Sequence, residues 1–311
     1  MVFRFIFWYP LRGLAPFLPE KIASCLAALS AVPLYLTDRE RVRILREELR
    51  RIINRETGHK AVNRAVRRSL VILCKSRMDL FRFKKQDNAL QKNPGILEGK
   101  QKLDSALEMG NGAMILTPHF GSHLTLLPLL HFSGYRVNQF ATRQTVWKDI
   151  PGARKDFLFH RALDIADKLE NAIPVRFIYQ DDSIKTLFRC LENNEILVMG
   201  FDGRMGKRWE PLPFLGRTAH FSRGFATIAE KTGAPVFLSF AVRSGEASAG
   251  RIILEGPWRF DKGGAEAEAV LGTMVSCVES YVKAYPCHYG EFLRLMRTRR
   301  DMDDPPFFKE P

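Results

Sequence analysis

Residues 115–124 read Ile-Leu-Thr-Pro-His-Phe-Gly-Ser-His-Leu, and they decide the fold. An apolar strand, Ala113 to Thr117, ends inside this stretch and delivers His119 just past its carboxyl end. Gly121 permits a close backbone approach, and Ser122 is suited to cap the helix that follows. Open α/β sheets place reacting groups beyond the carboxyl ends of their strands, beside helix N-termini. The stretch therefore predicts an α/β fold and a candidate catalytic histidine; a hydrogen-bonded structural histidine is the alternative.

Apolar runs alternate with helical patterns from about residue 95 onward. Further strands are predicted over Val137–Thr142, Val175–Tyr179, Ile196–Phe201, Val236–Val242 and Ile252–Leu254. Helices are predicted over residues 96–109, 122–133, 153–170, 183–193, 221–232 and 265–284. The alternation predicts an α/β core over residues 91–300, a mostly parallel or mixed sheet flanked by helices. A polar tail is expected over residues 301–311.

Residues 1–36 form the most apolar part of the chain. The charge-free stretch Ile22–Leu36 would reach about 22 Å as a helix, short of the roughly 30 Å hydrocarbon core of a bilayer, and it contains Pro33. We therefore expect an interfacial or half-inserted membrane anchor. A secretory signal peptide is the alternative, but charges interrupt the region that should be uniformly apolar, namely Arg12, Glu20 and Lys21.

The positive charge lies directly behind this apolar segment. The 311 residues carry a formal net charge of +14, and residues 38–85 hold 16 Lys and Arg against 6 Asp and Glu. Amphipathic helices are predicted within residues 37–90, the first capped by Thr37 with Glu40 three residues on. A cationic segment beside an apolar one is typical of an anionic membrane surface. Only the charge favours nucleic acid, since no nucleic-acid-binding motif accompanies it.

Composition excludes several other classes of protein. Apolar residues make up 46% of the chain and 23 residues are Phe, which excludes a disordered chain. Five scattered cysteines with no Cys-x-x-Cys pair exclude a disulfide scaffold and a structural zinc site. His119 and His123 are four residues apart, but the zinc-protease pattern needs Glu where Phe120 stands. We expect no metal and no cofactor.

A second polar stretch follows another predicted strand. Phe201-Asp202-Gly203-Arg204 ends that strand, and Ser222 and Arg223 open the helix predicted from residue 221. Free backbone N–H groups at a helix start, together with arginines, suit a phosphate or carboxylate. A salt-bridged loop is the alternative for each motif taken alone. Two strand ends of this kind, one with His and one with Asp-Gly-Arg, favour a shared site.

Together these motifs resemble the bacterial lipid A biosynthesis acyltransferases, the lauroyl and myristoyl transferases of the lysophospholipid acyltransferase superfamily. Residues 117–121 look like the family's His-Phe-Gly block, and Asp202-Gly203-Arg204 lies where relatives carry an acidic block. Phe214-Leu215-Gly216 is similar to a Phe-Phe-Gly turn, and residues 228–243 are similar to the helix and strand that follow it. Residues 286–291 are only loosely similar to the family's Pro-x-Gln-Trp ending.

The resemblance implies a membrane-associated O-acyltransferase at the cytoplasmic face of a bacterial inner membrane. His119 would be the general base. Asp202 is the substitute that we favour for its acidic partner, provided that the two strand ends are adjacent. The acyl donor would be acyl carrier protein or acyl-coenzyme A, and the acceptor a hydroxyl of a lipid or glycolipid. The substrate-binding residues would be Gly121, Ser122, His123, Arg204 and Arg223.

One departure from the family pattern bears on activity. The family has an acidic residue five positions after its histidine, where this chain has Leu124. A leucine side chain cannot orient an imidazole or stabilise its protonated form, and impairing the acid of a catalytic triad costs about 10⁴ in rate. His123, Asp202 or a carboxylate from elsewhere would have to fill that role. The alternative is a non-catalytic or impaired member that binds lipid or acyl carrier.

Overall fold

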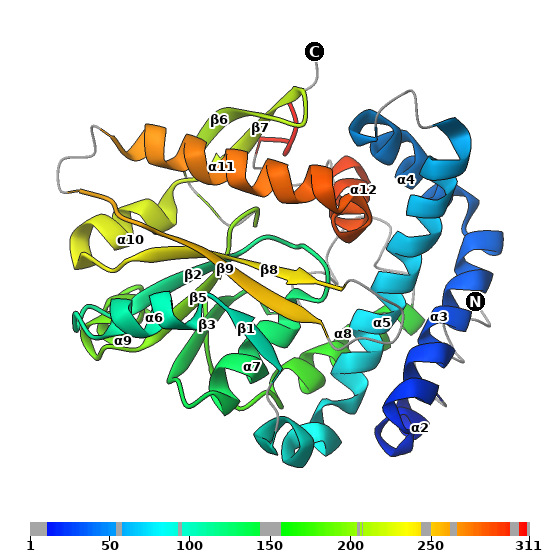
Figure 1. The fold of residues 1–311 in the computed structure, drawn as a ribbon, viewed down its shortest axis with the longest axis horizontal. Coiled ribbons are helices and arrows are strands. Elements are labelled where there is room, and N and C mark those ends of the chain that lie inside the picture. The colour runs from blue at the N-terminus through cyan, green and yellow to red at the C-terminus, as the bar shows by residue number, and fades with distance from the viewer. Residues whose placement is uncertain are drawn as a thin grey trace.

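The computed structural model describes residues 11–53, 58–92, 95–143, 157–203, 206, 208–243, 250–261, 266–298 and 305–309 (Figure 1). It contains an N-terminal group of helices packed beside one end of a mixed α/β core (Figure 1). The N-terminal helices are α2 (Arg12–Leu14), η2 (Ala15–Phe17), α3 (Glu20–Thr37), α4 (Arg39–Ile52) and α5 (Gly58–Lys92). The predicted helical region and α/β core are thus both present.

The core alternates strands and helices along the chain. Its strands are β1 (Ile96–Glu98), β2 (Ala113–Thr117), β3 (Val137–Ala141), β4 (Arg176–Tyr179), β5 (Ile196–Gly200), β6 (Trp209–Phe214), β7 (Arg217–Ser222), β8 (Val236–Val242) and β9 (Arg251–Trp258). Its helices are α6 (Lys100–Leu107), η4 (His123–Thr125), α7 (Leu126–Phe132), α8 (Phe157–Glu170), α9 (Lys185–Glu192), α10 (Gly224–Thr232), α11 (Ala267–Ala284), η6 (Pro286–His288) and α12 (Gly290–Thr298).

Seven strands form the main sheet in the order β1-β9-β8-β2-β5-β3-β4. Neighbouring strands run parallel except β8 and β9, which run antiparallel. Strand β2 lies at the centre, and all five of its residues are buried because strands flank it and apolar layers cover both faces. Met114 and Leu116 face one layer, with α10 and α11, whereas Ala113 and Ile115 face the other, with α6 and α7.

Three sequence predictions of element boundaries are wrong. Residues 96–98 form β1 rather than the start of a helix, because left-handed Gly99 packs against the Leu254 backbone and separates the strand from α6. Residues 221–222 end β7, so α10 begins later, at Gly224. The cap of α4 is Asp38, whose Oδ1 accepts the Arg41 N–H at 3.1 Å, because Thr37 still belongs to α3.

Strands β6 and β7 form a hairpin that the sequence pattern did not predict. Phe214 pairs with Arg217 across a two-residue turn, in which Leu215 and Gly216 both have positive φ. This is the turn expected at Phe214-Leu215-Gly216. Within the predicted polar tail, Phe307 is buried and Phe308 forms a β-bridge with Ala219 of the hairpin.

Helix α3 has two opposite faces. Its buried face is a stripe of alanines four residues apart, Ala23, Ala27 and Ala31, that packs in the N-terminal helical core. Its opposite face exposes Ile22, Cys25, Leu29, Val32 and Leu36. Among the described residues, no helix combines the length and the apolar character needed to cross a bilayer. Residues 1–10 of the predicted anchor lie outside the described residues.

Candidate active site

Two adjacent parallel strands bring the candidate base and acid together. β2 and β5 pair in register so that Thr117 lies opposite Gly200. His119 therefore follows one strand end and Asp202 follows the other. The Nδ1 atom of His119 lies 2.5 Å from Asp202 Oδ1, and the backbone N–H of His119 donates to Asp202 Oδ2 at 2.9 Å. A carboxylate thus contacts the histidine, although it comes from β5 rather than from position 124.

Asp202 is held by donors on both of its carboxylate oxygens. Its side chain has no solvent exposure. Besides the two contacts from His119, the Tyr289 hydroxyl donates to Asp202 Oδ2 at 2.8 Å. A buried carboxylate is tolerated when hydrogen bonds replace its hydration. The arrangement can orient the His119 ring and stabilise a positive charge on it.

The His119 ring is open to solvent on one side and supported on the other. Its side chain is 43% exposed, whereas that of its partner Asp202 is fully buried. Phe292 stacks against the ring, with centroids 5.2 Å apart and planes 16° apart. A half-exposed imidazole beside a buried carboxylate has the accessibility that a general base requires.

Gly121 shapes the loop after His119. Its φ is +60°, and a Cβ atom there would lie 2.2 Å from the backbone oxygen of Ala241 in β8. Its N–H donates to the His288 carbonyl oxygen at 2.8 Å. The glycine therefore allows the loop to pack directly on the sheet. That Gly121 contacts the substrate stays a prediction.

Ser122 lies in a buried polar network behind the loop. Its hydroxyl lies 2.8 Å from that of Ser76 on α5 and accepts from Arg243 Nε at 3.3 Å. Arg243 also forms an ion pair with Asp79 of α5. Ser122 occupies the N-cap position of η4, but its hydroxyl bonds to this network instead of capping the helix. The network connects the loop after His119 to the N-terminal helices.

His123 packs beside His119 as a neutral imidazole. The two ring centroids are 5.1 Å apart. Burial, followed by the nearby His119, lowers the pKa of His123 to about 4. Its Nδ1 atom is buried without a hydrogen-bond partner in the described part of the chain. It does not stand in for the missing acid, because Asp202 already contacts Nδ1 of His119.

Only one of the two arginines of the predicted anion site, Arg223, lies among the described residues. Arg223 precedes α10 and pairs with Glu210 at 3.0 Å. Arg204 lies outside the described residues. The binding of an anionic ligand by these arginines stays a prediction. No cluster of three or more His, Cys, Asp or Glu side chains suited to a metal ion occurs in the described ranges.

Sequence reasoning missed Tyr289 and Phe292. Tyr289 lies within residues 286–291, which are only loosely similar to the family's C-terminal motif, and Phe292 directly follows them, so no pattern marked either residue. The only available signal was the presence of aromatic residues within or directly after residues 286–291. Their roles depend on packing across more than 80 residues of sequence, since Tyr289 reaches Asp202.

One comparison with known proteins agrees with the motifs in the C-terminal part of the chain. Residues 170–298 match the model of the bacterial lipid A biosynthesis acyltransferase family. The matched range contains Asp202, Tyr289 and Phe292 but not His119. No curated protein matches the chain significantly. The match supports this family over that range, and the family implies an acyltransferase that uses an acyl donor and a lipid acceptor.

Proposed function

We propose that this chain, whose match supports the lipid A biosynthesis acyltransferase family, is an O-acyltransferase with a His119–Asp202 catalytic dyad. It would move a fatty acyl chain from a thioester donor to a hydroxyl of a lipid or glycolipid. The contact between His119 Nδ1 and Asp202 Oδ1 at 2.5 Å carries the proposal. It supplies the carboxylate that position 124 does not provide.

The proposed chemistry follows from the orientation of the imidazole. Because Nδ1 faces Asp202, Nε2 takes the proton of the acceptor hydroxyl as its oxygen attacks the thioester carbonyl carbon. A C–O bond forms, the tetrahedral intermediate collapses, and the C–S bond breaks. The protonated imidazole then returns its proton to the leaving thiolate. Asp202 stabilises the imidazolium between these two steps.

The same contact weighs against the non-catalytic alternative. Leu124 alone favours a module that binds lipid without turnover, since leucine cannot assist a base. A buried carboxylate already hydrogen-bonded to the histidine removes the reason for expecting that loss. Replacing Leu124 with Glu should accordingly leave the rate unchanged or lower it, whereas an enzyme lacking an acid would gain activity.

We place the enzyme at the cytoplasmic face of a bacterial inner membrane. The support is the outward apolar face of α3 together with exposed cations on α4 and α5: Arg39, Arg43, Arg50, Arg51, Lys60, Arg64, Arg67 and Arg68. Apolar side chains inserted at the interface and cations over anionic headgroups act together in peripheral binding. Such docking would bring the site to its lipid acceptor.

The test is transfer from acyl-carrier-protein and coenzyme A thioesters to lysolipid and lipid A-type acceptors. We expect His119→Ala to lower kcat by about 10²–10⁴ and Asp202→Asn by about 10⁴. His131→Gln, a histidine change on α7, is the matched control and should retain wild-type activity. The proposal would be falsified if wild-type protein showed no transfer above His119→Ala with any donor and acceptor pair.

A further inference from the structure

The junction between η6 and α12 contacts both members of the dyad. Tyr289, fully buried, donates its hydroxyl to Asp202 Oδ2 at 2.8 Å. Phe292, three residues later, is also buried and stacks on the His119 ring at 5.2 Å. The two aromatic rings pack together with centroids 4.7 Å apart. One short segment therefore touches the acid and the base at once.

Tyr289 is suited to be a permanent donor. Burial raises its pKa well above 10, and the neighbouring Asp202 raises it further. The hydroxyl therefore keeps its proton throughout the pH range in which proteins function. Asp202 receives this donor in addition to the backbone N–H of His119, and both contact the same carboxylate oxygen. The other oxygen is thereby directed toward Nδ1.

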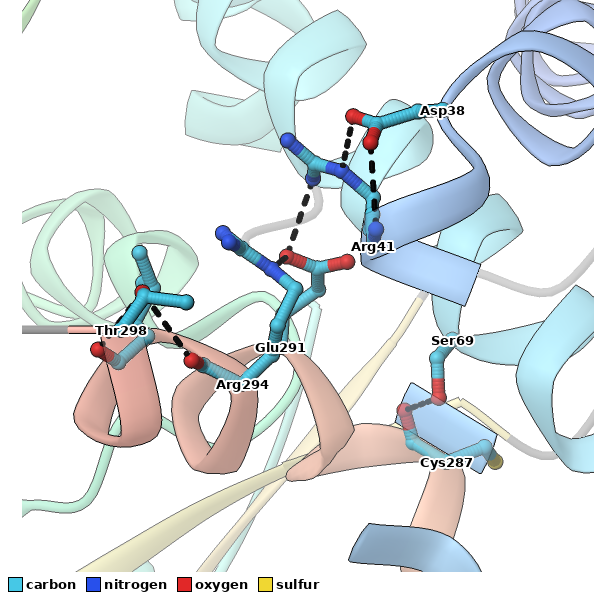
Figure 2. Close-up of polar contacts among 8 residues, drawn as sticks. Asp38, Arg41, Ser69, Cys287, Glu291, Arg294 and Thr298 are labelled. Carbon is cyan, nitrogen blue, oxygen red and sulfur yellow. Dashed lines mark hydrogen bonds and ion pairs between the residues drawn. The ribbon is translucent and has the colours of Figure 1, made fainter. Parts of the chain in front are cut away.

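The junction is in turn tied to the N-terminal helices (Figure 2). Arg41 of α4 donates to Glu291 Oε2 at 3.0 Å and to Asp38 Oδ2 at 2.9 Å, and Arg294 donates to the same Glu291 oxygen. Ser69 of α5 donates to the Cys287 carbonyl oxygen at 2.9 Å (Figure 2). These bonds flank Tyr289 on both sides in sequence. They fix the segment against helices that lie more than 200 residues earlier in the chain.

We infer that Tyr289 and Phe292 are positioning residues of the dyad, Tyr289 for the Asp202 carboxylate and Phe292 for the His119 ring. This inference rests on the proposed function, and it assigns the alignment of the dyad to a segment that α4 and α5 hold in place. Neither residue handles the transferred proton. A half-exposed imidazole has more than one rotamer available, and the Phe292 stack together with the fixed carboxylate selects one.

The decisive variant is Tyr289→Phe, which removes one oxygen and keeps the ring. We expect kcat to fall about 10- to 100-fold, the effect of losing one hydrogen bond to a charged group, with little change in KM. The acidic limb of the pH–kcat profile should move to higher pH, because a carboxylate that loses a donor stabilises the protonated His119 imidazole more strongly. Tyr281→Phe is the matched control, since its hydroxyl donates to another carboxylate, Glu255, at 2.6 Å.

A spectroscopic measurement separates this inference from the function itself. The His119 imidazole is titrated by NMR in wild type, Tyr289→Phe and Tyr281→Phe, which requires no turnover. A changed titration midpoint in Tyr289→Phe alone supports positioning even if no acceptor is ever found. Superimposable titrations and an unchanged kcat overturn it. If Tyr289→Phe does not fold, Phe292→Leu takes its place, with a loss in kcat and a changed His119 titration expected.

Discussion

His288 shows how one buried residue couples the candidate site to pH. Its Nε2 accepts the backbone N–H of Arg243 at 3.1 Å, so the ring is neutral in the folded protein. Burial and then Arg243 lower its pKa to about 4. Its carbonyl oxygen accepts the Gly121 N–H, and its ring stacks on Phe120. Protonation would therefore disturb the loop that carries His119.

Acid should destabilise the protein through this residue. The unfolded chain binds a proton at His288 near pH 6.5, and the folded chain only near pH 4. Unfolding therefore takes up a proton between these values, and stability is lost as the pH falls through that window. We expect a loss of roughly 2–3 kcal/mol from His288 between pH 7.5 and 4.5. Guanidinium unfolding curves at the two pH values measure it.

The free energy of unfolding should depend less on pH in His288→Gln, because glutamine is a polar side chain that does not titrate. His131→Gln, a change in a partly exposed histidine on α7, should retain the wild-type slope. An identical loss of stability in wild type and His288→Gln would assign the acid sensitivity to other groups.

At the scale of elements, the sequence predicted the structure best where burial was complete. Strands β2 and β8 consist wholly of buried residues, and apolar runs marked both with their observed bounds. The hairpin was missed because β6 contains two prolines and β7 alternates buried with partly exposed residues, including His220. Its stability comes from an aromatic cluster with residues that are distant in sequence, so no local pattern reveals it.

In the candidate site, too, residues that follow buried strands could be predicted from the sequence, and residues placed by long-range packing could not. His119 and Asp202 follow apolar strands, so their position at the sheet edge could be predicted, and their contact depends on β2 and β5 being neighbours. The order of strands in the sheet is set by the whole core and cannot be read from either motif. Tyr289 could not be predicted because its position depends on how α12 packs against α4.

The C-terminal segment should contribute strongly to stability through the hairpin. Phe307 is 2% exposed and packs against Phe214, Phe221 and Phe292. Phe307→Ala should lower the free energy of unfolding by about 3–5 kcal/mol, measured by guanidinium unfolding. Lys309→Ala keeps the hydrogen bond from the backbone N–H of residue 309 to the Thr218 carbonyl oxygen. This change should alter the free energy of unfolding by less than about 0.5 kcal/mol. Equal effects of the two changes would contradict a packing role for Phe307.

For the whole molecule, the two faces of α3 would separate folding from the proposed membrane binding. The alanine stripe packs inward, so changes on the outward face leave the core intact. The exposed fractions of Leu29 and Val32 are 58% and 52%. Together with the exposed cations of α4 and α5, a surface of this kind favours the proposed peripheral membrane protein over a nucleic-acid binder.

The double variant Leu29→Glu, Val32→Glu should lose most sedimentation with anionic liposomes, because carboxylates there oppose both insertion and headgroup charge. Its circular dichroism should match that of wild type. Ile184→Glu is the matched control, since Ile184 is 65% exposed and lies outside α3. Wild-type sedimentation by the double variant would exclude this face from membrane contact, and a gel shift with random DNA would favour the nucleic-acid alternative.

The central position of β2 decides what a shortened form of this protein could be. β5 and β8 each pair with β2 and are not neighbours, so a fragment of residues 170–298 lacks the strand between them, and it also lacks β1 and β3. The strand between β5 and β8 is β2, which is also the strand that His119 follows. Losing the base by truncation therefore means losing the fold as well, with the edges of β5 and β8 that pair with β2 among those left open to aggregation. Cleavage that removes the chain up to and including β2 should therefore clear the protein from the cell instead of leaving a folded, inactive fragment.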